Sequence, residues 1–272
     1  MAGTVLLTGA SGLLGTWLRR SAPRDVELVS MVHRRSVAGD AIAADLRDRR
    51  AVETAFKAVR PGLVIHAGFA RDEASIVDAT RHVAEVASDV ESGLLLVSSD
   101  AVFSGDGRPC AEASPPDPVW DYGRWKAAAE KIVTGCDPGA AIVRPPLIVS
   151  LGPEDHICAD IRAARASGEP SIWFTDEIRQ PAPADELAQA MWTIASLPPS
   201  ARAGAWHLPG SERLSRFELT TRAVEVLGLD GSSIVGAPTP TQAHRPRDLN
   251  LTGERAHRQL GWSPRRVHRP SP

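Results

Sequence analysis

Short apolar runs alternate with amphipathic stretches along the first half of the chain. The runs have the length of buried strands, and the stretches between them repeat apolar residues at helical spacing. We predict strands at residues 5–8, 27–32, 63–66, 94–98 and 141–143, and helices at residues 13–20, 50–59, 75–87 and 122–133. Strands that alternate with helices form a parallel sheet covered on both faces, so the pattern predicts an α/β fold with a Rossmann-type, doubly wound sheet.

The pattern changes after Pro146, where glycine and proline become more frequent. A short apolar run appears at residues 171–174, and two further helices are predicted at residues 184–196 and 216–227. Ser215 and Glu218 have the spacing of a capping box, which would start the second of these helices.

These observations divide the chain into two expected parts. Residues 1–147 would form the Rossmann domain, and residues 148–272 a smaller, mixed α/β C-terminal lobe that binds the substrate and is interleaved with the first part. Residues 263–272 show no periodicity, so we expect a loose tail there.

Composition narrows the class of partner. The net charge of the 272 residues is −2, so we expect no nucleic-acid partner, and no apolar stretch has the length of a membrane span. The three cysteines, Cys110, Cys136 and Cys158, are well separated and favour neither a disulfide framework nor a zinc site. No secretory signal pattern precedes the first strand, so a cytoplasmic location is expected, with the chain a monomer or a homodimer.

A glycine motif follows the first predicted strand directly. Gly9, Gly12 and Gly15 lie where this strand would turn into the first helix. Glycines at such a turn let the backbone approach a pyrophosphate, and the N–H groups at the helix start hold its charge. The alternative is a generic turn rich in small residues. We predict dinucleotide contacts at Gly9, Ser11, Gly12, Leu13, Leu14 and Gly15.

The end of the second strand indicates which dinucleotide is preferred. An acidic residue usually stands there in NAD-binding folds, but here Val32 is followed by His33, Arg34 and Arg35. Guanidinium groups suit a 2′-phosphate, so NADP(H) is favoured over NAD(H). The alternative is a solvated basic loop. Further cofactor contacts are expected at Asp45 and Leu46, near the adenine, and at His66, Ala67 and Gly68, where the third strand ends.

Three residues could transfer a proton. The strand at 94–98 leads to Ser99, and the only tyrosine, Tyr122, lies one helical turn before Lys126. A phenol ordinarily titrates near pH 10, and a cation one turn away would lower its pKa towards neutrality. Ser99 would orient the oxygen of a substrate. The alternative is a surface helix that carries a tyrosine and a lysine by chance.

Together these motifs resemble the extended short-chain dehydrogenase/reductases, which carry T-G-x-x-G-x-x-G, a Ser or Thr after the fourth strand, and Y-x-x-x-K. The dTDP-4-dehydrorhamnose reductase type is the most similar branch, through segments 97–105, 112–118, 176–181, 185–188, 245–246 and 260–262. The resemblance implies NAD(P)H-dependent reduction of a carbonyl, often on a nucleotide-linked sugar. Tyr122 would protonate the carbonyl oxygen, and Lys126 would also bind the nicotinamide ribose.

The chain departs from this branch at several positions. The family commonly has an Asn near position 76, which is Ile76 here, and Asn250 is the only asparagine. Ala101 replaces the tyrosine of the branch's S-T-D-Y. These positions face the substrate in the resembled family, so the substrate need not be a deoxysugar nucleotide. We predict substrate contacts at Ser99, Asp100, Trp120, Arg144 and Leu147.

The leading hypothesis is therefore an NADP(H)-dependent oxidoreductase acting on a small ketone or aldehyde. A sugar-nucleotide epimerase and a non-catalytic, NADP-binding regulatory subunit are the alternatives. Asp155, His156 and Cys158 are interpreted as a solvated loop rather than a metal site, so no metal is predicted.

Overall fold

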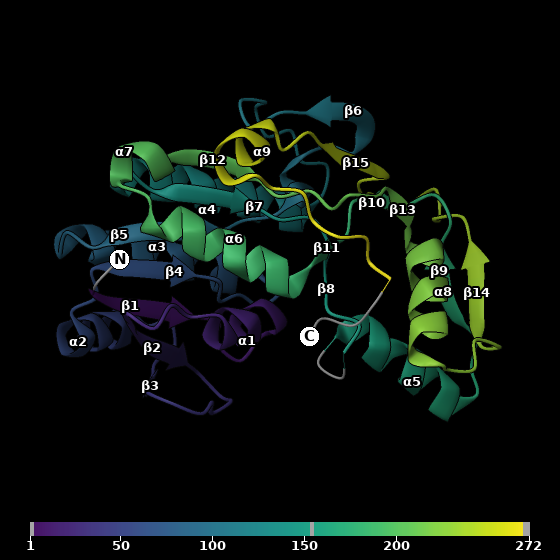
Figure 1. Cartoon of the computed structure of the whole chain (residues 1–272), viewed down its shortest axis with the longest axis horizontal. Helices are drawn as coiled ribbons and strands as arrows, with labels where there is room; N and C mark the ends of the chain where they lie inside the picture. The colour runs from purple at the N-terminus through teal and green to yellow at the C-terminus, as the bar shows by residue number, and fades with distance from the viewer. Residues whose placement is uncertain (1–2, 153–154, 269–272) are drawn as a thin grey trace.

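The computed structural model describes residues 3–152 and 155–268, and within them seven parallel strands form the main sheet (Figure 1). Their order is β12-β7-β5-β4-β1-β2-β3, which confirms the predicted doubly wound α/β fold. The strands are β1 (Gly3–Thr8), β2 (Val26–Val32), β3 (Ala41–Ala43), β4 (Leu63–His66), β5 (Gly93–Val97), β7 (Ala141–Arg144) and β12 (Gly204–His207).

Helices cover both faces of this sheet because its strands are apolar on both sides. Along β1, Val5 and Leu7 belong to one core and Leu6 to the other. Helices α1 (Leu13–Arg20) and α6 (Ala184–Ser196) pack into the first core. The second core is covered by α2 (Arg49–Val59), α3 (Ala79–Asp89) and α4 (Asp121–Cys136), and a π-helical turn, η1 (Ala74–Asp78), precedes α3.

A smaller lobe lies beside the main sheet, at the right of Figure 1. Its core lies among α5 (His156–Ser167), α8 (Arg216–Leu227) and the strand β9. The predicted capping box is present, because Ser215 and Glu218 each bond the other's backbone N–H. The remaining elements are η2 (Asp100–Val102), β6 (Asp106–Cys110), β8 (Ile148–Val149), β9 (Ser171–Phe174), β10 (Ile178–Arg179), β11 (Ala182–Pro183), α7 (Pro199–Arg202), β13 (Leu214–Ser215), β14 (Ile234–Ala237), β15 (Asp248–Leu251) and α9 (Glu254–Leu260).

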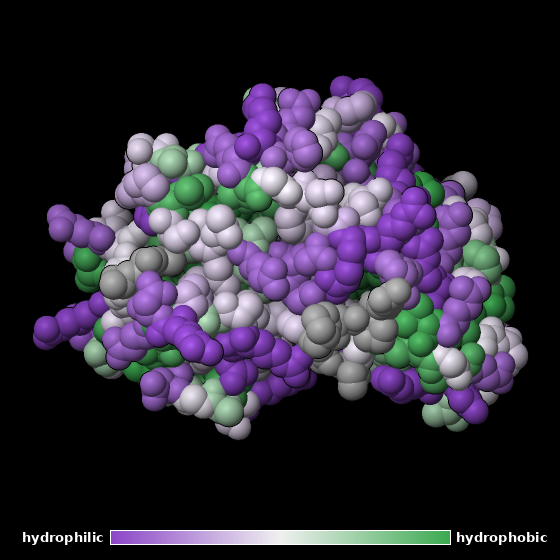
Figure 2. Space-filling view, viewed as in Figure 1, coloured by the Kyte–Doolittle hydropathy of each residue, from purple (hydrophilic) through white to green (hydrophobic). Residues whose placement is uncertain are grey.

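The second half of the chain also returns to the main sheet. Strand β12 pairs with β7 in parallel, with Gly204 opposite Ala141, and α6 packs against α1. Segments beyond residue 147 therefore complete the Rossmann sheet as well as the smaller lobe. Figure 2 shows a mostly hydrophilic face, with hydrophobic side chains gathered over the smaller lobe, around α8 and β14.

Two expectations about loops are wrong. Arg265 forms ion pairs with Asp185 and Glu186 at the start of α6, and Val267 is buried, so residues 263–268 are not loose. The rest of the expected tail, residues 269–272, lies outside the described residues.

Residues 155–158 are not a solvated loop either, because Asp155 caps α5 and residues 156–158 form its first turn. Asp155 is fully buried because its carboxylate caps α5 and accepts hydrogen bonds from the N–H groups of Ile157 and Ser150. Cys158 is buried too, whereas His156 is exposed. The described part of the chain holds no cluster of three metal-ligating side chains and no helix able to cross a membrane.

Helix α1 lies unusually close to the turn that precedes it. A Cβ atom on Gly15 would lie 2.2 Å from the carbonyl oxygen of Gly9, and one on Gly9 would lie 2.5 Å from that of Ala67. Gly9 also has a φ of +70°, which other residues rarely adopt. Glycine at both positions is therefore needed for β1, α1 and the end of β4 to pack together.

We expect Gly15→Ala to destabilise the fold by about 1–3 kcal/mol or more, because the added methyl group meets backbone that cannot move aside. Gly135→Ala is the matched control, since a Cβ there, near the end of α4, meets nothing within 4 Å. Alanine in a helix should stabilise at that site. Urea unfolding measures both variants, and equal stability of the two would contradict the packing argument.

Candidate functional site

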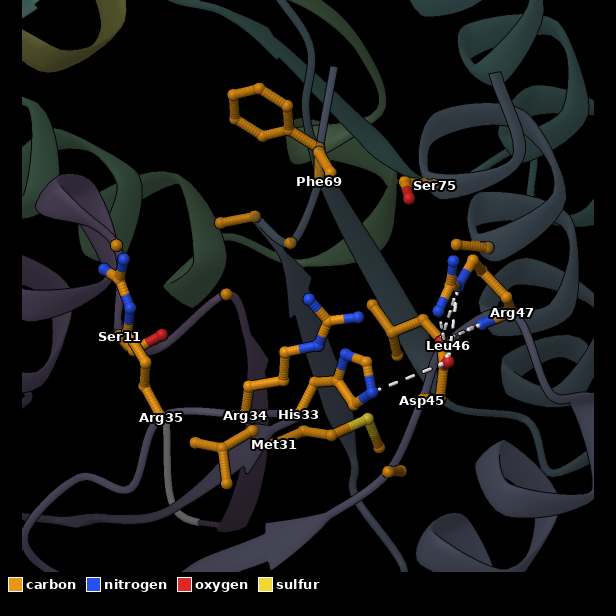
Figure 3. Close-up of a pocket in the computed structure, with 18 of the residues that line it drawn as sticks. Ser11, Met31, His33, Arg34, Arg35, Asp45, Leu46, Arg47, Phe69 and Ser75 are labelled. Carbon is orange, nitrogen blue, oxygen red and sulfur yellow. Dashed lines mark hydrogen bonds and ion pairs between the residues drawn. The ribbon is translucent and has the colours of Figure 1, made fainter. Parts of the chain in front are cut away.

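A cavity of about 580 Å³ opens at the carboxyl ends of β1, β2, β3 and β4 (Figure 3). These ends meet at one edge because the strands are parallel. Ten of the residues predicted to bind a dinucleotide line it: Gly9, Ser11, Gly12, His33, Arg34, Arg35, Asp45, Leu46, Ala67 and Gly68. The others that line it are Met31, Val32, Ala44, Arg47, Phe69, Ala70, Asp72, Ser75 and Ala79.

The glycine turn at this cavity fits a pyrophosphate. Gly12 begins α1 and brings no side chain to cap it, so first-turn N–H groups remain available to an anion. The side chains of Leu13 and Leu14 pack into the core instead, so only their backbone could contact a cofactor. Gly15 lies behind the turn, against Gly9, and has a packing role.

The basic edge of the cavity is larger than the sequence indicated. Arg34 and Arg35 line it, and the sequence analysis missed a third arginine, Arg47, two residues after Asp45. Arg47 Nε and Nη2 donate hydrogen bonds of 3.0 and 2.7 Å to the carboxylate of Asp45 (Figure 3), and His33 Nε2 lies 3.6 Å from it. The hydrogen bond from Arg47 holds the pKa of Asp45 well below its usual range. Asp45 was expected beside the adenine, but its carboxylate already binds Arg47.

His66 was expected at the cofactor and is instead fully buried behind the cavity. The Thr8 hydroxyl oxygen accepts bonds from the N–H groups of Ala67 and Gly68, so its hydrogen is free to donate to His66 Nδ1, 2.7 Å away. Nε2 must then carry the ring proton, and it lies 3.0 Å from the Thr80 hydroxyl. This chain of bonds fixes the backbone at 67–68 against the glycine turn.

The three residues predicted to transfer a proton meet where β5 ends and α4 begins. The Ser99 hydroxyl interacts with the phenol of Tyr122 and donates a 3.1 Å bond to Asp100 Oδ1. Lys126 Nζ donates a 3.0 Å bond to the carbonyl of Val97. A Cβ on Gly123 would lie 2.1 Å from the Ala101 carbonyl oxygen, so α4 packs closely on η2 at this point.

Phe69 connects the proton-transfer group to the cofactor cavity, and the sequence analysis missed it. Its ring lines the cavity, lies 6.0 Å from the ring of Tyr122, and has Lys126 Nζ 4.7 Å from its centroid. Half of this side chain is exposed. Phe69 could have been predicted at the cofactor cavity, because it directly follows Ala67 and Gly68, which were predicted there.

The pKa of the phenol moves in the opposite direction to the one expected. Burial raises the pKa of Tyr122 to about 12, and the charge of Asp100 adds to this, whereas Ser99 and Arg71 lower it. Lys126 is not among the groups that lower the pKa of this phenol, and its ammonium donates to the carbonyl of Val97. Burial also lowers the pKa of Lys126 to about 8, against the opposing effect of Glu130.

Two of the other residues predicted to contact substrate, Asp100 and Trp120, lie near Tyr122. Leu147 and Arg144 pack elsewhere. Trp120 lies beside the phenol, with ring centroids 5.4 Å apart, and burial raises the pKa of the neighbouring Asp100 to about 6. Leu147 packs against the core of the smaller lobe. Arg144 is a correction: it is buried and bonded to Glu130, because an internal carboxylate needs a cation, and it does not line the cavity at the glycine turn.

A second cavity, of about 570 Å³, lies in the smaller lobe, and the sequence analysis did not find it. Arg216 lines it with its guanidinium 5.3 Å from the centroid of Trp173. Arg245 also lines it and lies 5.4 Å from the centroid of Trp120, which in turn contacts Tyr122. The phenol is thus linked through Phe69 to one cavity and through Trp120 and Arg245 to the other.

The fold and these motifs define an extended short-chain dehydrogenase/reductase-type protein with a Rossmann sheet. The family model described as RmlD substrate binding domain matches residues 3–269, and the chain belongs to this family.

Two relatives carry different names. The dTDP-4-dehydrorhamnose reductase of Streptomyces griseus is 30% identical over 84% of this chain and 78% of its own length. Methionine adenosyltransferase 2 subunit beta of Bos taurus is 27% identical over 91% of this chain and 79% of its own length. The family therefore includes a protein named as a reductase, and the chain is also similar to a protein named as a subunit of another enzyme.

Solved structures share the fold. The dTDP-4-dehydrorhamnose reductase of Bacillus anthracis, in complex with NADP, has a TM-score of 0.79 at 21% identity, covering 100% of this chain and 95% of its own. The enzyme WbmG of Bordetella bronchiseptica, in complex with NAD and UDP, has a TM-score of 0.78 at 20% identity, covering 98% and 91%. Proteins of this fold are thus known with either dinucleotide bound.

The buried His66 makes stability depend on pH. Burial lowers its pKa to about 3, from 6.5 for a solvated histidine, so the unfolded chain binds a proton that the folded chain excludes between these values. Stability is therefore lost as the pH falls below 6.5. We expect His66→Gln to reduce this loss by up to about 1.4 kcal/mol per pH unit.

Urea unfolding between about pH 7 and pH 4 measures this slope. His257→Gln, at an exposed site on α9, is the control and should leave the slope nearer to that of the native chain. An unchanged slope in His66→Gln would mean that the folded state accepts the proton.

Proposed function

We propose that the chain is an NADP(H)-dependent reductase of a carbonyl group, with Tyr122 as the proton donor. The observation that carries this proposal is the position of the phenol, between the cofactor cavity and the second cavity, next to Ser99. A phenol with a pKa of about 12 keeps its proton at neutral pH. Reduction of a ketone or aldehyde consumes one proton at oxygen, so a protonated phenol suits this direction.

The roles follow from the contacts of each residue. Bound at the glycine turn, NADPH would supply the hydride to the carbonyl carbon. Tyr122 would give its proton to the carbonyl oxygen, and the Ser99 hydroxyl would hold that oxygen by a hydrogen bond. Lys126, beside Phe69 at the cavity, would bind the nicotinamide ribose. Trp120 would pack against the substrate on the side away from the cofactor.

The preference for NADP(H) is supported by the charge of the cavity. Arg34 and Arg35 contribute two guanidinium groups near the ribose end, and Arg47 adds a third that Asp45 holds in place. Such groups bind a 2′-phosphate and gain little from the 2′-hydroxyl of NAD.

The second cavity supports a sugar nucleotide as the substrate. Arg216 and Arg245 place two cations beside the aromatic rings of Trp173 and Phe174. Cations suit a diphosphate and flat rings suit a base. The relative from Streptomyces griseus is named for a nucleotide-linked sugar, and the similar fold of WbmG binds UDP.

A second candidate is a cofactor-binding subunit without turnover. The relative named as a subunit of methionine adenosyltransferase favours it, and so does Ile76, a fully buried apolar side chain where the resembled reductases commonly have an asparagine. In this case the cavity would bind a dinucleotide, and Tyr122 would serve no reaction.

Oxidation of NADPH against a panel of ketones, aldehydes and keto-sugar nucleotides distinguishes the two. We expect turnover with at least one carbonyl, and Tyr122→Phe should lower kcat by about 10²–10⁴-fold because the proton donor is lost. NADPH affinity of the variant, followed by cofactor fluorescence, should stay close to native. Binding of NADPH without turnover that depends on Tyr122 would support the subunit instead.

Cofactor choice is tested separately. Arg34→Ala together with Arg35→Ala should weaken NADPH binding by at least about tenfold and leave NADH binding nearly unchanged, because only NADPH carries the 2′-phosphate. The control is Arg50→Ala with Arg81→Ala, two exposed arginines on α2 and α3, which makes the same change in net charge. Equal losses for both cofactors would overturn the preference.

A further inference from the structure

One face of α4 is joined to the end of β5 at three successive turns. Tyr122, Lys126 and Glu130 are spaced by four residues, so they share this face. Tyr122 interacts with Ser99, Lys126 Nζ binds the carbonyl of Val97, and Glu130 Oε1 accepts a 2.5 Å bond from Ser98 Oγ. Three consecutive residues at the end of β5 and just beyond it, 97–99, thus meet three successive turns of the helix. Glu130 is the one member to which the proposed reaction gives no role.

Glu130 is held from the opposite side by Arg144. The guanidinium donates bonds of 2.9 Å from Nε and 2.7 Å from Nη2 to the two carboxylate oxygens. The side chains of Glu130 and Arg144 are only 8% and 6% exposed. Removing two charges from water costs several kcal/mol per ion, and this geometry offsets part of the cost. A buried pair of this kind is weak support for stability, so its position calls for another reason.

A neutral histidine fixes the orientation of Arg144. His207 Nδ1 lies 3.2 Å from the carbonyl oxygen of Cys110, so it carries the ring proton. Nε2 is then free to accept from Arg144 Nη1, also at 3.2 Å. Burial lowers the pKa of His207 to about 3, and the ring adds no charge. One donor of the guanidinium is thus bonded to His207, while Nε and Nη2 hold the carboxylate of Glu130, whose Oε1 also accepts from Ser98.

We propose that Glu130 is a positioning residue for Lys126, keeping its ammonium charged and seated at the end of β5. The proposal rests on the proposed function, in which Lys126 binds the cofactor ribose. The groups that face Lys126 are the Val97 carbonyl, the Phe69 ring, the neutral His66, and Tyr122 and Glu130 on its own helix. Glu130 is the one acidic side chain in this set, and Arg144 lies on its far side.

The protonation of Lys126 can be followed directly, because the chain has only three lysines. With lysine labelled by ¹³C at Cε, its three signals report titration in the folded, cofactor-free chain. Lys57→Arg and Lys131→Arg assign the two exposed lysines. We expect the remaining signal to titrate near pH 8 in the native chain.

Glu130→Gln keeps the shape of the side chain and removes its charge. We expect the Lys126 midpoint to fall by about one pH unit or more, because burial then acts on the ammonium without the opposing carboxylate. Glu130→Asp should restore part of the shift. Glu225→Gln, an exposed change on α8, is the control and should leave the midpoint unchanged. An unchanged midpoint in Glu130→Gln would overturn the proposal.

Glu130→Gln also leaves Arg144 buried without its partner, and this could prevent folding. The double variant Glu130→Gln with Arg144→Met removes both charges, fills the volume with an apolar chain, and should show a smaller downward shift, because a neighbouring cation is lost together with the carboxylate. Glu130→Asp keeps the charge and should hold the midpoint closer to the native value than either uncharged variant does, and a midpoint that falls by about one pH unit or more in Glu130→Asp would refute the proposal.

This readout is independent of the reaction. If the reductase proposal fails, the lysine titration still depends on Glu130. If the positioning proposal fails, turnover that depends on Tyr122 can persist, while the titration midpoint of Lys126 is the same in the native chain and in Glu130→Gln. NADPH affinity of Glu130→Gln across the same pH range then shows whether the charge of Lys126 matters to the cofactor.

Discussion

The site depends on one constraint, the parallel direction of the strands in the main sheet. Because every strand ends at the same edge, the glycine turn after β1, the basic residues after β2, the segment 67–69 after β4 and Ser99 after β5 gather there although up to 90 residues separate them. The close contact of Gly9 with Ala67, and of Gly15 with Gly9, brings the first and fourth strands near enough to shape a cavity. Helix α4 then closes the far side through Gly123.

Much of the fold could be predicted from the sequence where apolar spacing is regular over many residues. Helices α1, α6 and α8 and strand β4 begin and end at the predicted residues, and β9 coincides with the apolar run at 171–174. Strand β12 could not be predicted, because four residues carry no period and only their pairing with β7 makes them a strand. The same holds for β3 and for the two-residue strands of the smaller lobe. Their hydrogen bonds join segments that the local pattern does not connect.

The candidate site shows the same division between local and distant signals. Gly9, Ser99 and Tyr122 stand at the ends of regular elements, and their motifs were legible at fixed spacings. The ion pair of Asp45 with Arg47 could not be predicted, although the two residues are close in sequence. An arginine in an arginine-rich chain gives no sign of what it binds. Arg144 was assigned to the substrate for a similar reason: a charged residue at a strand end faces either a ligand or another buried charge. The packing of α4 decides between these two alternatives, because it brings Glu130 against Arg144.

Burial pushes Tyr122, Lys126 and the neighbouring His66 towards their neutral forms. It raises the pKa of Tyr122 and lowers those of His66 and Lys126. For a reductase this suits the phenol, which must hold a proton to give, and the histidine, which only braces the backbone. It does not suit Lys126, whose proposed contact with a ribose gains from a full positive charge. The carboxylate of Glu130, one turn further along the same helix, opposes the effect of burial on Lys126. A buried carboxylate must itself be paired with a cation. The contacts from Cys110 through His207 and Arg144 to Glu130 meet this requirement, and under the proposal they connect β12 and β7 to the charge of Lys126 on α4.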